Sequence, residues 1–322
     1  MKLGVFTVLL GEQSLDETLA YLKGLGVEAV EIGCGGFPGT AHCDAVNFIK
    51  DKSLIKEFQE TIKKHGMMVS ALSVHGNPVH PQQEIAEKFH KEYEAAVQLA
   101  AELEIDTVVT FSGCPGDSEN AKYPNWVTCP WPDDYLKILK WQWEEKLIPY
   151  WQKTAEFTKK NGVNKIALEL HPGFCVYNPE TLLRLRAAVG EIIGANLDPS
   201  HLFWQGMDPV AAIRELKGTI YHFHAKDTKI DFYNTSRNGV LDTKHFTNED
   251  QRSWLFRTVG YGHAEETWRA ICSALQLAGY DHVMSIEHED SLMTPTEGLT
   301  KAVAFLKKVM IFEQKPTGMW WA

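Results

Sequence analysis

Four short segments in the second half of the sequence each carry, at or near their end, side chains that can bind a metal ion or exchange a proton. They are ALELH, with Glu169 and His171, NLDPSH, with Asp198, HFHAKD, with His224, and SIEHED, with Glu287. Each follows an apolar run that is typical of a buried β-strand. Three carboxylates brought together would repel one another and would be costly to remove from water unpaired. A divalent cation would cancel most of that charge.

One imidazole with three carboxylates and no thiolate suits a hard or borderline ion, such as Mn²⁺, Mg²⁺ or Co²⁺, with Zn²⁺ as a further choice. Other interpretations exist for single residues. Asp198 precedes Pro199 and could be a turn residue only. His222 lies on the same side of its strand as His224, so it could be the ligand instead, or a core histidine. Four such residues on four consecutive strands favour a metal site formed by Glu169, Asp198, His224 and Glu287.

The segments that would position these residues alternate along the whole chain between strand-like and helix-like patterns. Start signals mark several helices, namely the capping boxes Ser14-x-x-Glu17 and Thr294-x-x-Glu297 and the pairs Asn178-Pro179 and Asp208-Pro209. The strand-like runs are eight in number and cover residues 3–10, 29–33, 67–75, 106–113, 165–171, 193–198, 219–227 and 282–290.

Strands that alternate with helices imply parallel strands joined by right-handed crossovers. Eight such units in 322 residues predict an α/β protein of the (β/α)8 TIM-barrel class, with residues 1–322 forming a single domain. A doubly wound sheet is the main alternative, but no G-x-G-x-x-G follows the first strand. In a barrel the last four strands are neighbours, so inward side chains near their carboxyl ends would meet.

Two insertions interrupt the βα rhythm, at residues 114–140 after the fourth strand and at residues 228–263 after the seventh. Both follow the carboxyl end of a strand, where barrel active sites lie. Both are rich in Asn, Asp, Gly, Pro and aromatic residues, so we predict two ordered lids rather than linkers.

The composition excludes several classes of partner. A formal net charge of −10 argues against nucleic-acid and anionic-membrane surfaces, which need basic residues. No stretch reaches the ~18 apolar residues of a membrane helix. The apolar run after Lys2 is too short for a signal peptide and predicts a first strand. The six cysteines form no C-x-x-C pair, which predicts free thiols and a cytoplasmic location. The terminal GMWWA suggests an oligomer contact, so a homo-oligomer is a further expectation.

The chain resembles the xylose isomerase-like TIM-barrel superfamily, in particular its sugar phosphate isomerase/epimerase group. The resemblance spans nearly the whole chain and rests on LELHPG, NLDPSH, HAKD, GYGH and SIEHED as a set. It implies that Glu169, Asp198, His224 and Glu287 bind one divalent metal ion, with Mn²⁺ favoured. It also implies that Glu169 and Glu287 flank the substrate as an acid/base pair. By similarity, His201 and the GYGH loop would contact the substrate.

The sequence departs from one branch of this superfamily. Endonuclease IV holds three zinc ions with extra histidines, whereas the fourth strand here ends in Ser112 and Gly113, and no Asp-x-His pair follows the seventh strand. Hydrolysis of nucleic acid is therefore disfavoured. No Gly-rich phosphate cradle follows strand seven or eight, so the word phosphate in the group's description has no support from these residues.

These residues suit chemistry next to a carbonyl group. A base would remove the adjacent proton and give a metal-stabilised enediolate. Return of the proton to the other face epimerises, return to the neighbouring carbon isomerises, and loss of a β-substituent eliminates water or an aglycone. We therefore predict a divalent-metal-dependent isomerase or epimerase of a small sugar or cyclitol. A lyase or dehydratase acting on a keto-sugar or 3-keto-glycoside is the alternative, and a non-catalytic sugar-binding protein is a third interpretation.

Further residues have both a functional and a structural interpretation. His171 shares the inward side with Glu169 and is a third candidate for proton transfer, because histidine titrates near neutral pH. The alternative for His171 is a hydrogen bond to a neighbouring side chain. Lys226 is a predicted substrate contact, with a salt bridge to Asp227 or Glu289 as the alternative.

Three other residues are predicted to bind the substrate. His75 ends the third strand and could contact a hydroxyl group, or make only a loop hydrogen bond. Trp126, in the first insertion, could pack on the apolar face of a sugar. Arg257, in the second insertion, could bind a substrate carboxylate or only lid carbonyl groups, as could Arg237 and Arg252.

Overall fold

The barrel strands are apolar nearly throughout, because helices cover the barrel on its outside and side chains fill its interior. All five residues of β2 (Ala29–Gly33) and of β6 (Ile193–Leu197) are buried. A computed structural model describes residues 1–313, 318–319 and 321. Its parallel strands close into a barrel in the order β1-β10-β7-β6-β5-β4-β3-β2. The remaining strands are β1 (Lys2–Phe6), β3 (Met68–Ser73), β4 (Thr107–Thr110), β5 (Lys165–Glu169), β7 (Ile220–Ala225) and β10 (Val283–Ile286).

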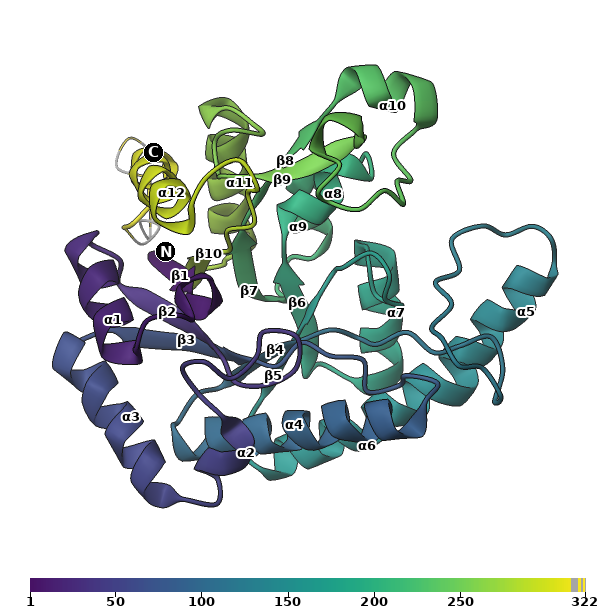
Figure 1. Cartoon of the computed structure of the whole chain (residues 1–322), viewed down its shortest axis with the longest axis horizontal. Coiled ribbons are helices and arrows are strands. Elements are labelled where there is room, and N and C mark those ends of the chain that lie inside the picture. The colour runs from purple at the N-terminus through teal and green to yellow at the C-terminus, as the bar shows by residue number, and fades with distance from the viewer. Residues whose placement is uncertain (314–317, 320, 322) are drawn as a thin grey trace.

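The predicted (β/α)8 barrel is therefore confirmed, and each predicted strand is present. Several strands end earlier than predicted. The first ends at Phe6, where Thr7–Leu10 form a 3-10 helix, the fourth ends at Thr110 and the last ends at Ile286. Helices surround the barrel (Figure 1). They are α1 (Leu15–Gly24), α2 (Ala45–Phe48), α3 (Lys52–His65), α4 (Gln83–Glu102), α6 (Ile148–Lys160), α7 (Pro179–Val189), α8 (Pro199–Trp204), α9 (Pro209–Glu215), α11 (Glu265–Ala278) and α12 (Pro295–Val309).

The predicted helix starts are formed by side-chain caps. Ser14 and Glu17 make the reciprocal capping box of α1. The side chains of Asn178, Asp208 and Thr294 each accept a hydrogen bond from a backbone N–H of the helix that follows. In each of these three cases proline occupies the first turn, where its missing N–H has no intrahelical partner to lose.

The two insertions differ in structure. After β4 the chain runs without regular structure to α5 (Asp134–Trp141), and the helix continues through a π-helical turn (Gln142–Leu147) into α6. After β7 the chain forms a two-stranded antiparallel sheet of β8 (Asp227–Ile230) and β9 (Trp254–Arg257), which the sequence analysis did not predict. Between these strands in the sequence lie α10 (Phe232–Asn238), which is labelled near β8 and β9 in Figure 1, and a 3-10 turn (Glu249–Gln251).

Two predictions concern the chain as a whole. Within the described part of the chain, every helix is too short or too polar to cross a membrane. The GMWWA segment includes positions 320 and 322, which lie outside the described residues.

Candidate metal centre and substrate site

The four predicted ligands gather at the carboxyl ends of their strands. Glu169 is the last residue of β5, Asp198 follows β6, His224 lies in β7 and Glu287 follows β10. Each offers one ligand atom, and these atoms all lie within 4.8 Å of one another. Asp198 is also the N-cap of α8, because its Oδ1 accepts a hydrogen bond from Ser200 N at 2.8 Å. The cap fixes the Asp198 carboxylate and leaves Oδ2 free to face the other ligands.

Three atoms of this group are buried polar atoms without a hydrogen-bond partner. Among the described residues, no hydrogen bond reaches Asp198 Oδ2, His224 Nδ1 or Glu287 Oε2. His224 Nδ1 lies 2.9 Å from Glu287 Oε2 and 3.2 Å from Glu169 Oε2, without the alignment of a hydrogen bond. Buried polar atoms rarely lack partners in proteins. Convergence of unpartnered oxygen and nitrogen atoms from three strand ends is the arrangement that a divalent ion requires.

Lys226 is the buried cation beside this group. Its Nζ lies 2.6 Å from Glu289, 3.2 Å from Glu287 and 3.8 Å from Asp198. The salt bridge to Glu289 considered in the sequence analysis is thus present. One ammonium charge cannot balance these three carboxylates together with Glu169, so the residues still fit a divalent ion next to Lys226.

Neighbouring imidazole and amide groups hold Glu169. Its Oε2 accepts hydrogen bonds from His75 Nε2 and Asn196 Nδ2, each at 3.1 Å. His201 Nε2 lies 3.2 Å from Glu169 Oε1 and 3.3 Å from Asp198 Oδ2. Burial raises the pKa of Glu169, but contacts with His201, His224 and His75 outweigh it and hold that pKa well below its usual range. The structure therefore places both His75 and His201, which were predicted to bind the substrate, beside the candidate ligand Glu169.

The other ligands differ in their electrostatics. Burial is the largest influence on Asp198 and raises its pKa to about 6. Burial also acts to raise the pKa of Glu287, but the charges of Lys226 and His224 outweigh it, and the pKa falls below its usual range. Burial lowers the pKa of His224, and the charges of Glu31 and Glu287 more than reverse this, so the pKa rises well above the usual value.

Glu31 is the functional candidate that the sequence analysis missed. It lies in β2, is fully buried and accepts hydrogen bonds from Ser73 Oγ and Ser285 Oγ. Both of its carboxylate oxygens lie 3.0 Å from His224 Nε2. Burial raises the pKa of Glu31, but the charges of His224 and His222 outweigh this and lower it to about 2. The only signal in the sequence is one acidic residue inside the apolar strand AVEIG.

His171 lies two residues beyond Glu169, and its tautomer is defined by the backbone. Its Nδ1 donates a hydrogen bond to the carbonyl oxygen of Pro172 at 2.6 Å. Nε2 of the neutral ring is therefore a hydrogen-bond acceptor. Histidine usually titrates near neutral pH, but burial and the neighbouring His201 lower the pKa of His171 to about 3.

Two cavities lie beside the ligands, and His171 and Glu289 line both of them. The smaller, which we call the reaction compartment, has a volume of about 170 Å³. Its remaining lining residues are Phe6, Val8, Phe37, Pro38, His75, Phe111, Glu169, Lys226 and Glu287. The larger, which we call the aromatic compartment, has a volume of about 400 Å³. Its remaining lining residues are Trp126, Pro172, Gly173, His201, Trp204, Asp242, Phe246, Trp254 and Phe256.

Two groups that were predicted to contact the substrate, Arg257 and the GYGH loop, do not line these compartments in the described structure. Within the described residues, Arg257 lines neither compartment, and its Nε lies 3.2 Å from Asp290. The GYGH loop contacts a protein carboxylate, because the backbone N–H groups of Gly260, Gly262 and His263 all donate to Asp227 Oδ2. Both groups therefore have partners within the protein that do not require a substrate.

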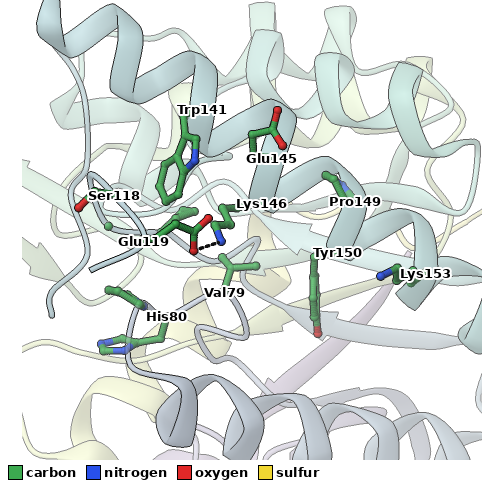
Figure 2. Close-up of a pocket in the computed structure, with 13 residues that line it drawn as sticks. Val79, His80, Ser118, Glu119, Trp141, Glu145, Lys146, Pro149, Tyr150 and Lys153 are labelled. Carbon is green, nitrogen blue, oxygen red and sulfur yellow. Dashed lines mark hydrogen bonds and ion pairs between the residues drawn. The ribbon is translucent and has the colours of Figure 1, made fainter. Parts of the chain in front are cut away.

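A third cavity, of about 350 Å³, lies between the first insertion and α6 (Figure 2). Its charged side chains include Glu119 and Lys146, which form an ion pair at 2.7 Å. His80 Nδ1 accepts a hydrogen bond from the backbone N–H of Gln82 at 3.0 Å. None of the grouped candidate metal ligands in the described part of the chain lines this cavity. Two of the candidate ligands, Glu169 and Glu287, line the reaction compartment instead.

The fold and this site together define a TIM-barrel protein with a candidate metal centre at the carboxyl ends of its strands. A family model described as xylose isomerase-like TIM barrel matches residues 19–309. The chain belongs to that family. It is also 38% identical over 312 residues to the uncharacterized protein YfiH of Bacillus subtilis strain 168, which covers 96% of this chain and 99% of YfiH.

Several solved structures share the fold at low sequence identity. The probable 3-DHS dehydratase AsbF of Bacillus anthracis has a TM-score of 0.65 at 17% identity, covering 95% of this chain and 99% of AsbF. The 3-keto-D-glucoside 4-epimerase YcjR of E. coli has a TM-score of 0.63 at 15% identity, covering 96% and 99%. The IolI protein, solved with a zinc atom, has a TM-score of 0.65 at 20% identity, covering 96% and 98%.

Proposed function

We propose that this protein is a divalent-metal-dependent isomerase or epimerase that enolises a small sugar or cyclitol. The observation that carries the proposal is the convergence of Asp198 Oδ2, His224 Nδ1 and Glu287 Oε2, which are buried and form no hydrogen bond in the described structure, beside the Glu169 carboxylate. The proposed ligands are Glu169, Asp198, His224 and Glu287, and Mn²⁺ is the favoured ion. When bound, the ion would act as a Lewis acid toward a carbonyl oxygen and an adjacent hydroxyl oxygen.

The proposed proton transfers belong to Glu169 and Glu287. Both carboxylates line the reaction compartment, and both have a pKa held below the usual range, so each is ionised and able to accept a proton at neutral pH. Apolar rings of Phe6, Phe37 and Phe111 line the same space and would limit water around the reacting carbon. His75 and Lys226 would hydrogen-bond to hydroxyl groups of the sugar.

His171 is proposed to assist at the border of the two compartments. Its Nδ1–H is engaged by Pro172, so Nε2 can accept a hydrogen bond from a hydroxyl group of the substrate. Because this side chain lines both compartments and its Nδ1–H is already engaged, we assign His171 to positioning and to short-range proton movement, and the main abstraction step to the two glutamates.

The fold neighbours support this class of chemistry. They include a 3-keto-D-glucoside 4-epimerase, a D-psicose 3-epimerase and a probable 3-DHS dehydratase. A lyase or dehydratase remains the second candidate function. It is favoured by the aromatic compartment, because a leaving group would need space next to the carboxylates. The free state of the six cysteines supports the expected cytoplasmic location.

The test combines metal analysis with isotope exchange. Purified protein should contain about one divalent ion per chain. It should also incorporate solvent deuterium next to the carbonyl of an accepted keto-sugar, scored by NMR over free ketoses, phosphorylated sugars and 3-keto-glycosides. Glu169→Gln should lose both the ion and the exchange, while the exposed-site variant Glu28→Gln should keep both. Three zinc ions per chain, or exchange that is unaffected in Glu169→Gln, would contradict the proposal.

A further inference from the structure

We propose that the aromatic compartment binds a second ring joined to the reacting sugar, so that the substrate is a glycoside rather than a free monosaccharide. The inference rests on the proposed function, because the first ring is taken to occupy the reaction compartment. The second ring could be another sugar or an aromatic aglycone. Both present a flat face that packs on aromatic side chains.

The volumes of the two compartments are the first observation that supports a two-ring ligand. The reaction compartment measures about 170 Å³ and the aromatic compartment about 400 Å³. Small-molecule sites in proteins generally occupy about 300 to 1,000 Å³. The reaction compartment alone is below that range, whereas the two together lie within it. Because His171 and Glu289 line both spaces, a ligand could extend from one into the other past these two side chains.

The aromatic compartment is next to the proposed chemistry. His201 lines it and also lies 3.2 Å from Glu169 and 3.3 Å from Asp198. Phe256 lines it as well, and its ring centre lies 4.3 Å from Lys226 Nζ. A ring bound here would therefore be one linkage away from a sugar held at the carboxylates.

The aromatic walls are already ordered by contacts among themselves. The rings of Trp204 and Trp254 stack with centres 4.6 Å apart and planes 6° from parallel. The rings of Phe246 and Phe256 stack at 5.7 Å and 18°. The Arg252 guanidinium lies 4.1 Å from the Phe246 ring and 4.7 Å from the Trp254 ring. A wall fixed in this way loses little conformational entropy when a ring packs on it.

Two indole N–H groups of this compartment have no acceptor. Trp204 is 5% exposed, Trp126 is half-buried, and the Nε1 atom of each lacks a hydrogen-bond partner among the described residues. By contrast, Trp254 Nε1 donates to Val240 O at 3.0 Å. Buried tryptophan usually finds an acceptor for its N–H group. Both tryptophans line the compartment, and their rings match a ligand that offers a flat apolar face, as a glycoside does.

The direct test is a binding comparison that needs no turnover. Methyl, phenyl and glucosyl glucosides, in both anomeric forms, would be titrated into the metal-loaded protein by calorimetry. The phenyl or the glucosyl compound should bind at least about tenfold more tightly than the matching methyl compound, as expected for one added ring on an aromatic wall. A preference for phenyl would identify an aromatic aglycone, and a preference for glucosyl would identify a second sugar.

Variants of residues that line the aromatic compartment test whether the tighter binding of the phenyl or glucosyl compound arises there. Trp126→Ala and Phe246→Ala should each remove most of the gain while leaving the affinity for the methyl glucoside unchanged. Trp126→Phe keeps a ring but removes the N–H group, so it should lose only part of the affinity gain. This conservative variant also serves as a control in case Trp126→Ala does not fold. Trp131→Ala is the matched control, because Trp131 lies in the same insertion, is 74% exposed and is absent from the lining of the compartment in the described structure.

The inference is overturned if all three glucosides bind equally, if none of them binds, or if the gain survives in both Trp126→Ala and Phe246→Ala. Failure of the proposed function would look different. In that case no keto-sugar would exchange deuterium in the metal-loaded protein, although the ring-bearing glucosides would still bind more tightly than the methyl compounds.

Discussion

His224 uses one ring nitrogen to face Glu31 and the other to face the candidate metal ligands. Nε2 lies 3.0 Å from both carboxylate oxygens of Glu31, while Nδ1 lies 2.9 Å from Glu287 Oε2. When a histidine binds a metal ion through one ring nitrogen, a carboxylate that accepts a hydrogen bond from the other nitrogen fixes the orientation of the ring. It also makes the ligating nitrogen more basic. In the proposed metal centre, Glu31 would therefore be a positioning residue that acts through His224.

The first prediction concerns Glu31→Gln. This change keeps an acceptor for His224 Nε2 but removes the negative charge, so metal affinity should fall by about 10- to 100-fold. Chelator competition measures this, and Glu31→Asp should recover part of the lost affinity. Glu28→Gln, just before the same strand and exposed, should bind metal as the wild type does. Equal metal affinity in wild type and Glu31→Gln would show that Glu31 has only a packing role.

The second prediction separates His171 from the ligands. His171→Ala should keep one metal ion per chain, because its Nδ1 is engaged by Pro172 and the proposed ligand set is complete without it. Turnover and deuterium exchange should fall by about 10²-fold, the lower end of the range for a lost proton-transfer group. Elemental analysis and NMR exchange measure the two effects. Unchanged exchange would remove His171 from the mechanism, and loss of metal would make it a ligand.

Much of the fold could be predicted because each barrel strand is an apolar run followed by a polar site residue or a helix signal. The ligand group followed from the same pattern, since parallel strands bring their carboxyl ends together. The β8–β9 sheet could not be predicted in this way, because its strands pair only with each other and not with the barrel. Glu31 was missed because its partner His224 is 193 residues away, and one acid within a strand has no periodicity.

The third prediction concerns the GYGH loop. A Cβ atom added at Gly262 would lie 2.4 Å from Asp227 Oδ1 and 2.4 Å from the backbone oxygen of Thr228. Because one of these atoms is backbone, Gly262→Ala should lower the free energy of unfolding by about 1 to 3 kcal/mol. Gly24→Ala is the control, since nothing lies within 4 Å of its added Cβ at the end of α1. That variant should be neutral or slightly stabilising. Urea unfolding measures both, and equal stability of the two variants would contradict the close contact.

The fourth prediction is a pH effect of His42. Its Nε2 donates to Gln13 O at 3.0 Å and its Nδ1 accepts from Thr7 Oγ1 at 3.0 Å, so the folded protein holds a neutral ring. Burial lowers the pKa of His42 below 6.5 in the folded state. The unfolded chain therefore binds the proton first as the pH falls. The stability present above pH 6.5 should decrease below it, by at most about 1.4 kcal/mol per pH unit. Urea unfolding of wild type and His42→Gln between pH 5 and 8 should give a shallower acid decline in the variant, and parallel curves would contradict the assignment.

The last prediction concerns removal of the metal ion. Without it, the carboxylates of Glu31, Glu169, Asp198 and Glu287 are held in the interior against only two cations in the described structure, the ammonium of Lys226 and the imidazolium of His224. A chelator should therefore lower the free energy of unfolding, by about 2.7 kcal/mol relative to protein with ion at 100 times its dissociation constant. Calorimetry should show the loss, and added Mn²⁺ should reverse it.

Asp198→Asn provides the decisive comparison for that experiment. Asparagine can still cap α8, as the aspartate does by accepting from Ser200 N, so the fold should persist. The variant removes one buried charge and one ligand atom. It should therefore be more stable than the wild type when both are free of metal, and it should gain little from added Mn²⁺. If the chelator leaves the wild type unchanged and Asp198→Asn is destabilised in every condition, Lys226 and His224 balance the carboxylates without a metal ion and the proposed metal centre is wrong.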